Sequence, residues 1–274
     1  MLNSYQEGDF MLRFSIVIPN YNKGPYIDEC LQSILNQSIN KDKYEIIVID
    51  DGSNDNSLDI LAKYPTIKLL HTNRMLAGGA RNAGIKVAQG EYLVFLDSDD
   101  FLCTNNVLEK LDEHIKGEDL IFLNYYKQSP KGTTLVEEQP NSSAMQPNTT
   151  GSFGCPTKCF KKSIVTLFDE KCYYEDIYFT LYAICNSKTY SFFTPPFFTY
   201  RYVQGSITKS KEISSKKMID LLIQISKLYY LCDMFPAHKD SLIERIKNDR
   251  LNDRLKVLNE YFETGNNTFY DVFK

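Results

Sequence analysis

The N-terminal part of the chain alternates short apolar runs with segments whose apolar residues recur at helical spacing, and this alternation limits the possible folds most. The runs predict strands and the periodic segments predict helices. The strands are expected over 14–18, 45–49, 67–70 and 93–96, and the helices over 25–37, through Leu58 and Leu61, and up to Gly90. Because such a repeat joins parallel strands by right-handed crossovers, we predict an α/β fold with a mainly parallel central sheet flanked by helices.

Polar residues follow the end of each predicted strand. They occupy 20–22, 50–51, 71–73 and 97–99. In open sheets of this kind, ligands bind outside the carboxyl ends of the strands. The four clusters are therefore expected to share one edge of the sheet and to form a ligand site there.

The densest cluster is the acidic stretch 97–100, which follows the apolar run 93–96 directly. Carboxylates two residues apart, such as Asp97 and Asp99, can hold a divalent cation when a phosphorylated ligand completes its coordination shell. An acidic turn that caps the next helix is the alternative interpretation. A calcium loop between two helices is disfavoured, because the stretch lacks the Gly and the distal Glu of that pattern.

Composition excludes several classes of protein. The 274-residue chain is 43% hydrophobic and 24% charged, with a net charge of −4, which argues against nucleic-acid binding as the main task. Its seven cysteines form no Cys-x-x-Cys pair, so reduced, mostly buried thiols in a cytoplasmic protein are expected. No secretory signal is visible, and no apolar stretch approaches the roughly 20 residues that span a bilayer.

The chain divides by pattern into three parts. Residues 1–12 are expected to be a polar leader, 13–210 a single domain, and 211–274 a helical extension with a break at Pro236. Within the domain, a helix is predicted over 105–116 and a strand over 120–123. The Ser, Thr, Asn, Gln, Gly and Pro residues of 127–152 predict a long surface excursion.

Four motifs occur in order along the first part of the domain. They are Ile-Val-Ile-Pro-Asn-Tyr-Asn at 16–22, Ile-Asp-Asp-Gly-Ser-Asn-Asp at 49–55, Ala-Arg-Asn-Ala-Gly at 80–84, and Gly-Glu-Tyr followed by Leu-Asp-Ser-Asp-Asp between 90 and 100. Together they closely resemble a family 2 inverting glycosyltransferase with the GT-A fold. The resemblance is strong over 14–101, weaker to about 208, and absent from the tail. It implies a nucleotide-binding half, 13–101, followed by an acceptor half, 102–210.

The resemblance implies transfer of a sugar from a nucleotide-sugar, expected to be a UDP-sugar, to an acceptor hydroxyl. The acceptor would be a glycan or lipid-linked glycan in surface-polysaccharide or lipopolysaccharide assembly. Asp51 would accept a hydrogen bond from the base, and Asp99 would contact Mn²⁺ or Mg²⁺, which offsets charge on the leaving diphosphate. The nucleotide-binding residues implied in this way are Pro19, Asn20, Tyr21, Asp51, Asn73, Asp97 and Ser98.

The stretch Glu175-Asp176 resembles the acidic pair that opens a helix in the second half of the family. It implies that Asp176 is the general base, ionised at neutral pH with an ordinary pKa near ~3.9, while Glu175 holds it or contacts the acceptor. The alternative is that both residues only cap the helix. Further diphosphate or acceptor contacts, each with a structural alternative, are expected at Arg81, Lys158, Arg201 and Ser206.

Two interpretations of the tail stay open. Its apolar residues at helical spacing predict a helix packed on the domain, or on a second subunit of a homo-oligomer. A cluster of lysines would instead favour peripheral contact with the inner face of a membrane. That cluster comprises Lys209, Lys211, Lys216 and Lys217.

Two rival functions also stay open. A nucleotidyltransferase would use a similar sheet and a metal-bound diphosphate, but it should carry a Gly-rich basic loop after the first strand, and residues 20–24 fit that poorly. A nucleotide-sugar or glycan-binding protein without turnover is the non-enzymatic alternative. The intact Asp51, Asp99 and Asp176 argue against it.

Overall fold

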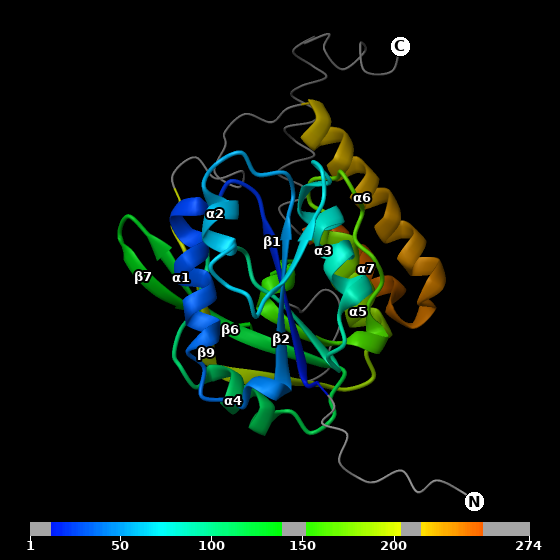
Figure 1. Ribbon diagram of the computed structural model, residues 1–274. Coiled ribbons are helices and arrows are strands. Elements are labelled where there is room, and N and C mark those ends of the chain that lie inside the picture. The colour runs from blue at the N-terminus through cyan, green and yellow to red at the C-terminus, as the bar shows by residue number, and fades with distance from the viewer. Residues whose placement is uncertain (1–11, 139–151, 204–214, 249–274) are drawn as a thin grey trace, which may run out of the picture.

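The computed structural model describes residues 12–138, 152–203 and 215–248. These residues form one central sheet with helices on both faces (Figure 1). The strands are β1 (Phe14–Asn20), β2 (Tyr44–Asp50), β3 (Lys68–His71), β4 (Tyr92–Phe95), β5 (Phe101–Leu102), β6 (Leu120–Ser129), β7 (Gly132–Val136), β8 (Lys158–Lys161) and β9 (Tyr190–Tyr200). The helices are α1 (Gly24–Leu35), α2 (Ser57–Leu61), α3 (Leu76–Val87), α4 (Val107–His114), α5 (Asp176–Asn186), α6 (Ser215–Met234) and α7 (Lys239–Asn248).

The first half of the sheet is parallel, in the order β3-β2-β1-β4. Its register places Asn20 opposite Asp50, and Asp50 opposite His71. The carboxyl ends of these strands therefore lie side by side. The predicted strands and the helices between them are confirmed in this half.

The second half of the sheet is mixed. β8 runs antiparallel to β4 and to β6, and β9 then pairs with β6 in parallel. β7 pairs with the outer part of β6, and β5 pairs with the end of β9. The resulting sheet continues directly from the parallel half without a break between strands.

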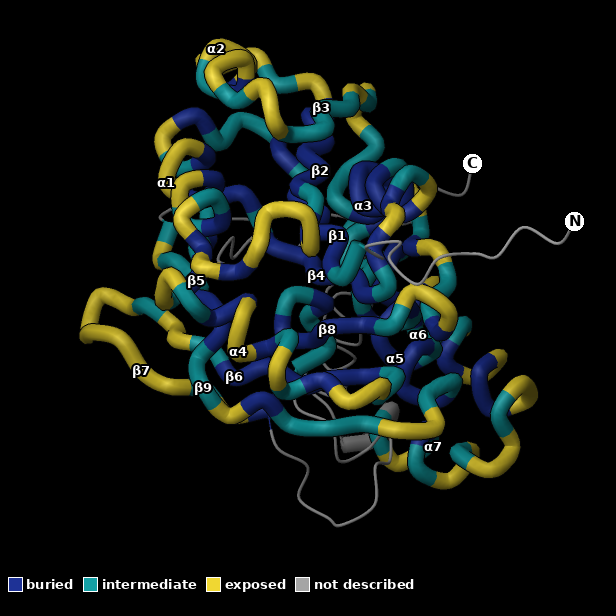
Figure 2. The backbone as a smooth tube through the Cα atoms, turned by 60° about the horizontal axis from the view of Figure 1, so that its bottom comes forward, coloured by how far each residue is buried: buried dark blue, intermediate teal, exposed yellow. Residues whose placement is uncertain are grey.

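The expected surface excursion over 127–152 is corrected for its first part. Residues 127–129 end β6, and 132–136 form β7, so this stretch is a hairpin. Gly132 has φ +125°, a conformation that glycine reaches without steric cost, and this permits the tight turn. β7 is almost wholly exposed, as its colour in Figure 2 shows. Residues 139–151 lie outside the described residues.

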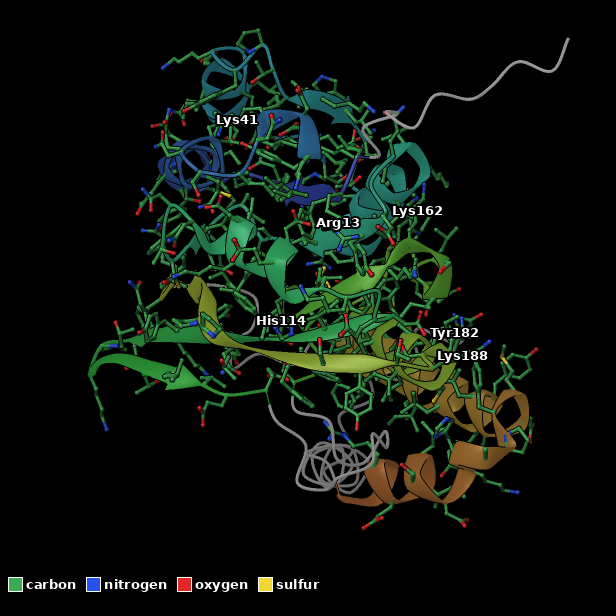
Figure 3. The ribbon with its side chains drawn as sticks, turned by 90° about the horizontal axis from the view of Figure 1, so that it is seen from below. Arg13, Lys41, His114, Lys162, Tyr182 and Lys188 are labelled. Atoms are coloured by element: carbon green, nitrogen blue, oxygen red, sulfur yellow. The ribbon has the colours of Figure 1, made fainter. Side chains whose placement is uncertain are left out.

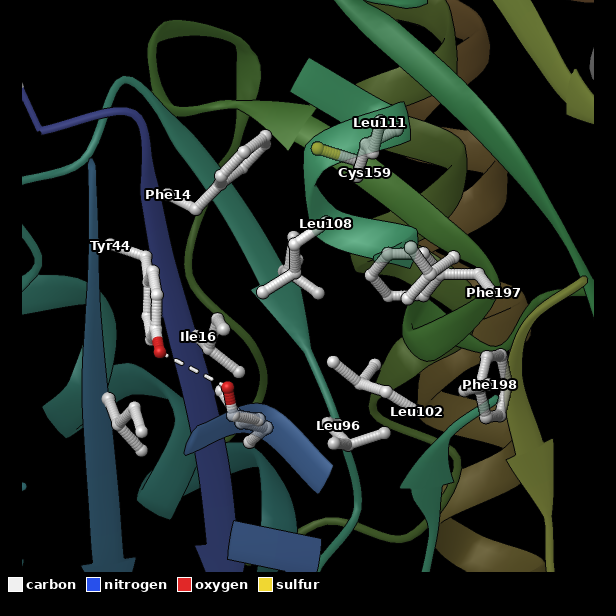
Figure 4. Close-up of a cluster of buried hydrophobic side chains, with 14 of the residues drawn as sticks. Phe14, Ile16, Tyr44, Leu96, Leu102, Leu108, Leu111, Cys159, Phe197 and Phe198 are labelled. Atoms are coloured by element: carbon white, nitrogen blue, oxygen red, sulfur yellow. Dashed lines mark hydrogen bonds between the residues drawn. The ribbon is translucent and has the colours of Figure 1, made fainter. Parts of the chain in front are cut away.

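Successive side chains along a strand point to opposite faces of the sheet, so the strands contribute to two cores, one on each face. Ile16 and Ile18 of β1 point toward the core beneath α1 and α4, part of which is shown in Figure 4. Val17 points the other way, toward the core beneath α3, α5 and α6. Tyr44 lies in the first core with its hydroxyl bonded to the Ile34 carbonyl at 3.1 Å.

An ion-pair cluster fastens the amino ends of the central strands. Arg13, labelled in Figure 3, precedes β1. Its guanidinium pairs with Glu91 and, through Nε at 2.9 Å, with Asp112 of α4. The same guanidinium lies 4.8 Å from the centre of the Tyr92 ring. These contacts tie the start of β1 to the start of β4 and to α4.

The described part of the tail packs on the domain. Leu221, Leu228 and Leu231 of α6 and Leu242 of α7 are buried in the same core as α5. This agrees with the first interpretation of the tail, and contact with a second subunit or a membrane stays a prediction. Among the described residues, no helix is both long and apolar enough to cross a bilayer. Residues 1–11 of the predicted leader, 1–12, and the end of the tail, 249–274, lie outside the described residues.

Candidate active site

The loops after β1 and β2 are held together by a buried hydrogen-bond network. Asn20 Nδ2 donates to Asp50 Oδ1 at 2.9 Å and to Ser53 Oγ at 3.2 Å. Ser53 N donates in turn to Asp50 Oδ2 at 3.0 Å. Asn20 and Asp50 are each 1% exposed, so both support the loops and Asp50 has little surface to offer a ligand.

Asp51 is fixed between the loops that follow β1 and β3. Its amide donates to the Asn20 carbonyl at 2.8 Å. Its Oδ1 accepts from Thr72 Oγ1 at 2.7 Å and from the Met75 amide at 2.8 Å, while no described residue donates a hydrogen bond to Oδ2. The protein therefore holds the carboxylate through one oxygen, and the other oxygen can accept a hydrogen bond from a ligand.

An aromatic side chain and a cation lie on the loops that flank Asp51. The Arg74 guanidinium lies 4.2 Å from the centre of the Tyr21 ring. Arg74 and Leu76 both have positive φ, 56° and 59°, so the backbone turns sharply between β3 and α3. Asn73 is exposed in the same turn. Tyr21 and Asn73, both predicted to bind nucleotide, thus lie on loops that flank Asp51.

Each carboxylate of the acidic turn after β4 has a partner. Asp97 Oδ1 accepts from Arg81 at 2.7 Å, Asp99 Oδ2 accepts from Lys23, and Asp100 Oδ1 accepts from the Arg201 amide at 2.9 Å. Asp100 is only 1% exposed, and burial raises its pKa well above the usual range, with the charge of Asp97 adding to the effect. Asp97 has the most exposed side chain of the three, at 34%.

Arg81 joins this acidic turn to the start of α5. One nitrogen of its guanidinium donates to Asp97 at 2.7 Å and another donates to Glu175 Oε1 at 2.6 Å. The guanidinium also lies 5.5 Å from the centre of the Phe168 ring. Since two arms of Arg81 are engaged and its side chain is 7% exposed, these contacts fit the structural alternative better than a direct diphosphate contact.

Asp176 begins α5, directly after Glu175. Burial raises the pKa of Asp176 to about 7, the Glu175 charge adds to the rise, and the positive charge of Arg81 opposes it. The expectation of an ordinary carboxyl pKa was wrong, because the spacing of the motif does not show how far the carboxyl is withdrawn from water. A carboxyl that titrates near neutrality suits general-base work better than one near ~3.9.

Of two further predicted contacts, the one at Lys158 needs correction. Lys158 is fully buried, and its Nζ donates to the Ser152 carbonyl at 2.6 Å and to Thr157 Oγ1 at 2.8 Å. With no exposed surface, it cannot touch an acceptor. Arg201 Nε donates to the Asp99 carbonyl at 2.7 Å, and its guanidinium forms an ion pair with Glu29 at 2.8 Å, contacts that fit the structural alternative for this residue.

The remaining predicted residues are placed as follows. Pro19 lies near the end of β1, and Ser98 is 2% exposed inside the acidic turn. Ser206 lies outside the described residues.

The acidic turn fits a shared cation site. Within the described residues, no three His, Cys, Asp or Glu side chains are grouped to hold a metal by themselves. Asp97 and Asp99 each engage one carboxylate oxygen with a basic side chain, which leaves a second oxygen on each. Mg²⁺ in nucleotide sites is commonly held by one or two carboxylates plus substrate phosphates.

Comparison with protein families decides the identity at family level. The family described as "Glycosyl transferase family 2" matches residues 15–202, which include every motif and the acidic pair at 175–176. The chain belongs to glycosyltransferase family 2. The predicted enzyme class is thereby confirmed at the level of the family.

Two relatives of this family 2 chain come from Staphylococcus aureus. The poly(ribitol-phosphate) beta-N-acetylglucosaminyltransferase TarP of strain N315 is 31% identical over 251 residues, covering 84% of this chain and 75% of TarP. TarS of strain Mu50, also a poly(ribitol-phosphate) beta-N-acetylglucosaminyltransferase, is 27% identical over 257 residues, covering 87% of this chain. The chain spans only 44% of the length of TarS.

Solved structures confirm the predicted fold. The crystal structure of S. aureus TarS 1-349 in complex with UDP-GlcNAc superposes with a TM-score of 0.72 at 25% identity, covering 88% of this chain and 74% of the other. A mannosyltransferase from Pyrobaculum calidifontis, solved with GDP-Man and Mn²⁺, gives a TM-score of 0.56 at 16% identity, covering 95% and 82%. The family 2 chain thus has the GT-A type of α/β fold.

Sequence reasoning missed several residues that shape the site. Lys23, Asp50 and Asp100 were not assigned, although all lie within or beside the polar clusters. The position of Lys23 directly after the cluster 20–22 was a usable signal. Phe168, which stacks under Arg81, gave none, because only the fold brings it there.

Proposed function

We propose that this protein transfers a sugar, with inversion, from a UDP-sugar to a hydroxyl of a surface polymer. The single observation that carries the proposal is the Arg81 bridge, which joins Asp97 of the acidic turn to Glu175 beside Asp176. Two segments far apart in sequence are thereby fastened together, one suited to a diphosphate and the other to proton transfer.

In this mechanism the nucleotide-binding half holds the donor. Asp51 accepts the N–H of the base through its free oxygen, beside the ring of Tyr21. Asp97 and Asp99 would hold a divalent cation, which when bound offsets the charge of the leaving diphosphate. The partly exposed Asp97 and the loops after β1 to β3 then orient the sugar at the carboxyl edge of the sheet.

The acceptor half supplies the base. Asp176 takes the proton from the acceptor hydroxyl as its oxygen attacks the anomeric carbon from the side opposite the diphosphate. The attack forms the new glycosidic bond, breaks the bond to the diphosphate and inverts the anomeric configuration. Arg81 holds Glu175, and so the first turn of α5, at a fixed distance from the acidic turn.

The relatives suggest the substrates. TarP and TarS are poly(ribitol-phosphate) beta-N-acetylglucosaminyltransferases, and TarS was solved with UDP-GlcNAc. We propose an acceptor of the same kind, a polyol-phosphate polymer of the cell surface, with UDP-GlcNAc or UDP-glucose as the donor. The free cysteines, mostly buried, fit the reducing compartment in which a cytoplasmic enzyme would work.

The proposal is tested with a donor screen. The full chain is incubated with Mn²⁺ and UDP-GlcNAc, UDP-glucose or GDP-mannose, with and without poly(ribitol phosphate), and nucleotide release is measured. We expect release of UDP from one UDP-sugar that depends on the polymer and is lost with EDTA. Formation of UTP and sugar 1-phosphate when pyrophosphate is added would favour the nucleotidyltransferase, and binding without release would favour a protein without turnover.

A further inference from the structure

Lys23 is assigned no role by the sequence motifs or by the comparisons. It follows the polar loop at the end of β1, and its ammonium group reaches Oδ2 of Asp99 in the acidic turn. The Lys23 and Asp99 side chains are 27% and 19% exposed. The pair therefore lies at the open edge of the site and not in the core.

The backbone is anchored at both ends of this pair. The Lys23 amide donates to Ser57 Oγ at 3.2 Å, which fixes the start of α1. The Asp99 carbonyl accepts from Arg201 Nε at 2.7 Å, which fixes the acidic turn. A ligand that enters can thus displace the four-carbon arm of Lys23 more easily than either backbone.

The neighbouring pair shows why Lys23 is the exchangeable cation. Arg81 is 7% exposed, and it is held by Asp97 and Glu175 at once, so releasing it would strand a buried charge. Lys23 is partly solvated and bonds to one carboxylate oxygen of Asp99. Breaking this second pair leaves both charges within reach of water, which costs little.

We propose that Lys23 is the counter-ion of Asp99 in the donor-free protein, that it competes with the divalent cation for this carboxylate, and that it turns to the diphosphate when the donor binds. An ammonium group on Oδ2 of Asp99 and a divalent cation on the other oxygen of the same carboxylate repel each other, so each weakens the binding of the other. Phosphate oxygens are good acceptors for a displaced lysine. The inference rests on the proposed function, because it assumes that a cation and a diphosphate meet at Asp99.

The test measures binding and not turnover. Mn²⁺ affinity without nucleotide is followed by the electron paramagnetic resonance of free Mn²⁺, and UDP affinity in EDTA is followed by calorimetry. Lys23→Met should bind Mn²⁺ about fivefold more tightly than wild type and bind UDP about fivefold more weakly, as the loss of one partly exposed ion pair implies. Lys63→Met, at an exposed site away from the acidic turn, is the control of equal charge and should change neither affinity.

Adding Asp99→Asn to Lys23→Met should remove the gain in Mn²⁺ affinity, because the carboxylate over which the cations compete is then absent. Mn²⁺ affinity in Lys23→Met equal to or below that of wild type overturns the inference, as does an equal gain in Lys63→Met. That failure leaves the proposed function standing as long as Asp99→Asn abolishes transfer. Full transfer by Asp99→Asn would instead count against the proposed function itself.

Discussion

At the scale of residues, environment decides which of several similar carboxylates can do chemistry. Asp50 and Asp100 are each 1% exposed and hold loops in place, whereas Asp97 keeps a third of its side chain open. Asp51 is 4% exposed, and what distinguishes it from Asp50 is that one of its oxygens is held by the loop after β3 while no described residue donates to the other. The acids of the site thus divide into those that build it and those that can meet a ligand.

The pKa of Asp176 predicts a pH dependence of transfer. Burial raises this pKa to about 7, and the base must be deprotonated to accept the proton of the acceptor hydroxyl. The ratio kcat/KM, which reports the pKa of the free enzyme, should therefore rise with pH and reach half its maximum near pH 7. The measurement is kcat/KM for the acceptor across about pH 5.5 to 8.5. A profile that is flat over this range would contradict the assignment.

The residues of the site were only partly predictable. Asp51, Asp97 and Asp99 were placed at one edge because polar residues at the ends of parallel strands must converge there. The burial of Lys158 could not be foreseen from the sequence. Its ammonium group bonds to the backbone carbonyl of Ser152, which no residue type marks, and pairs with Glu138, which is distant in sequence. Side-chain exposure depends on non-local packing, which local patterns do not contain.

At the scale of elements, the sequence patterns predicted strands and helices correctly where these elements are long and regular. The short strands β5, β7 and β8 were missed because they exist through pairing with β9, β6 and β4, not through their own alternation. The helices α3 and α5 matter most for function, since Arg81 lies on the first and Asp176 begins the second.

The contact between α3 and the loop before α5 can be tested at Gly78. A methyl group added there would lie 2.5 Å from the Asp169 carbonyl oxygen and 3.0 Å from Glu175 Cγ. Gly78→Ala should therefore lower stability by about 1–3 kcal/mol in denaturant unfolding and lower transfer by displacing the base.

Gly84→Ala is the matched control, because it lies on the same helix and the three nearest atoms to its added methyl belong to the core side chains of Val17 and Ile49. It should affect stability without moving Glu175, and so retain more transfer than Gly78→Ala. Equal transfer by the two variants would show that the close approach at Gly78 does not position the base.

At the scale of the whole molecule, two half-sheets share one site. The parallel half brings the loops that suit a nucleotide, and the mixed half brings α5 to the same edge through β8, which pairs with β4. The fold class was predictable from the alternation in the first half. The strand order of the second half was not, because it depends on antiparallel pairings between short segments.

The central claim is that Asp176 removes the acceptor proton while the other half holds the donor, and Asp176→Asn tests it most directly. Transfer from radiolabelled donor and UDP affinity are measured on the same preparation. The account predicts that transfer falls by at least about 10²-fold, while UDP affinity stays within about twofold of wild type. Full turnover by Asp176→Asn would contradict it.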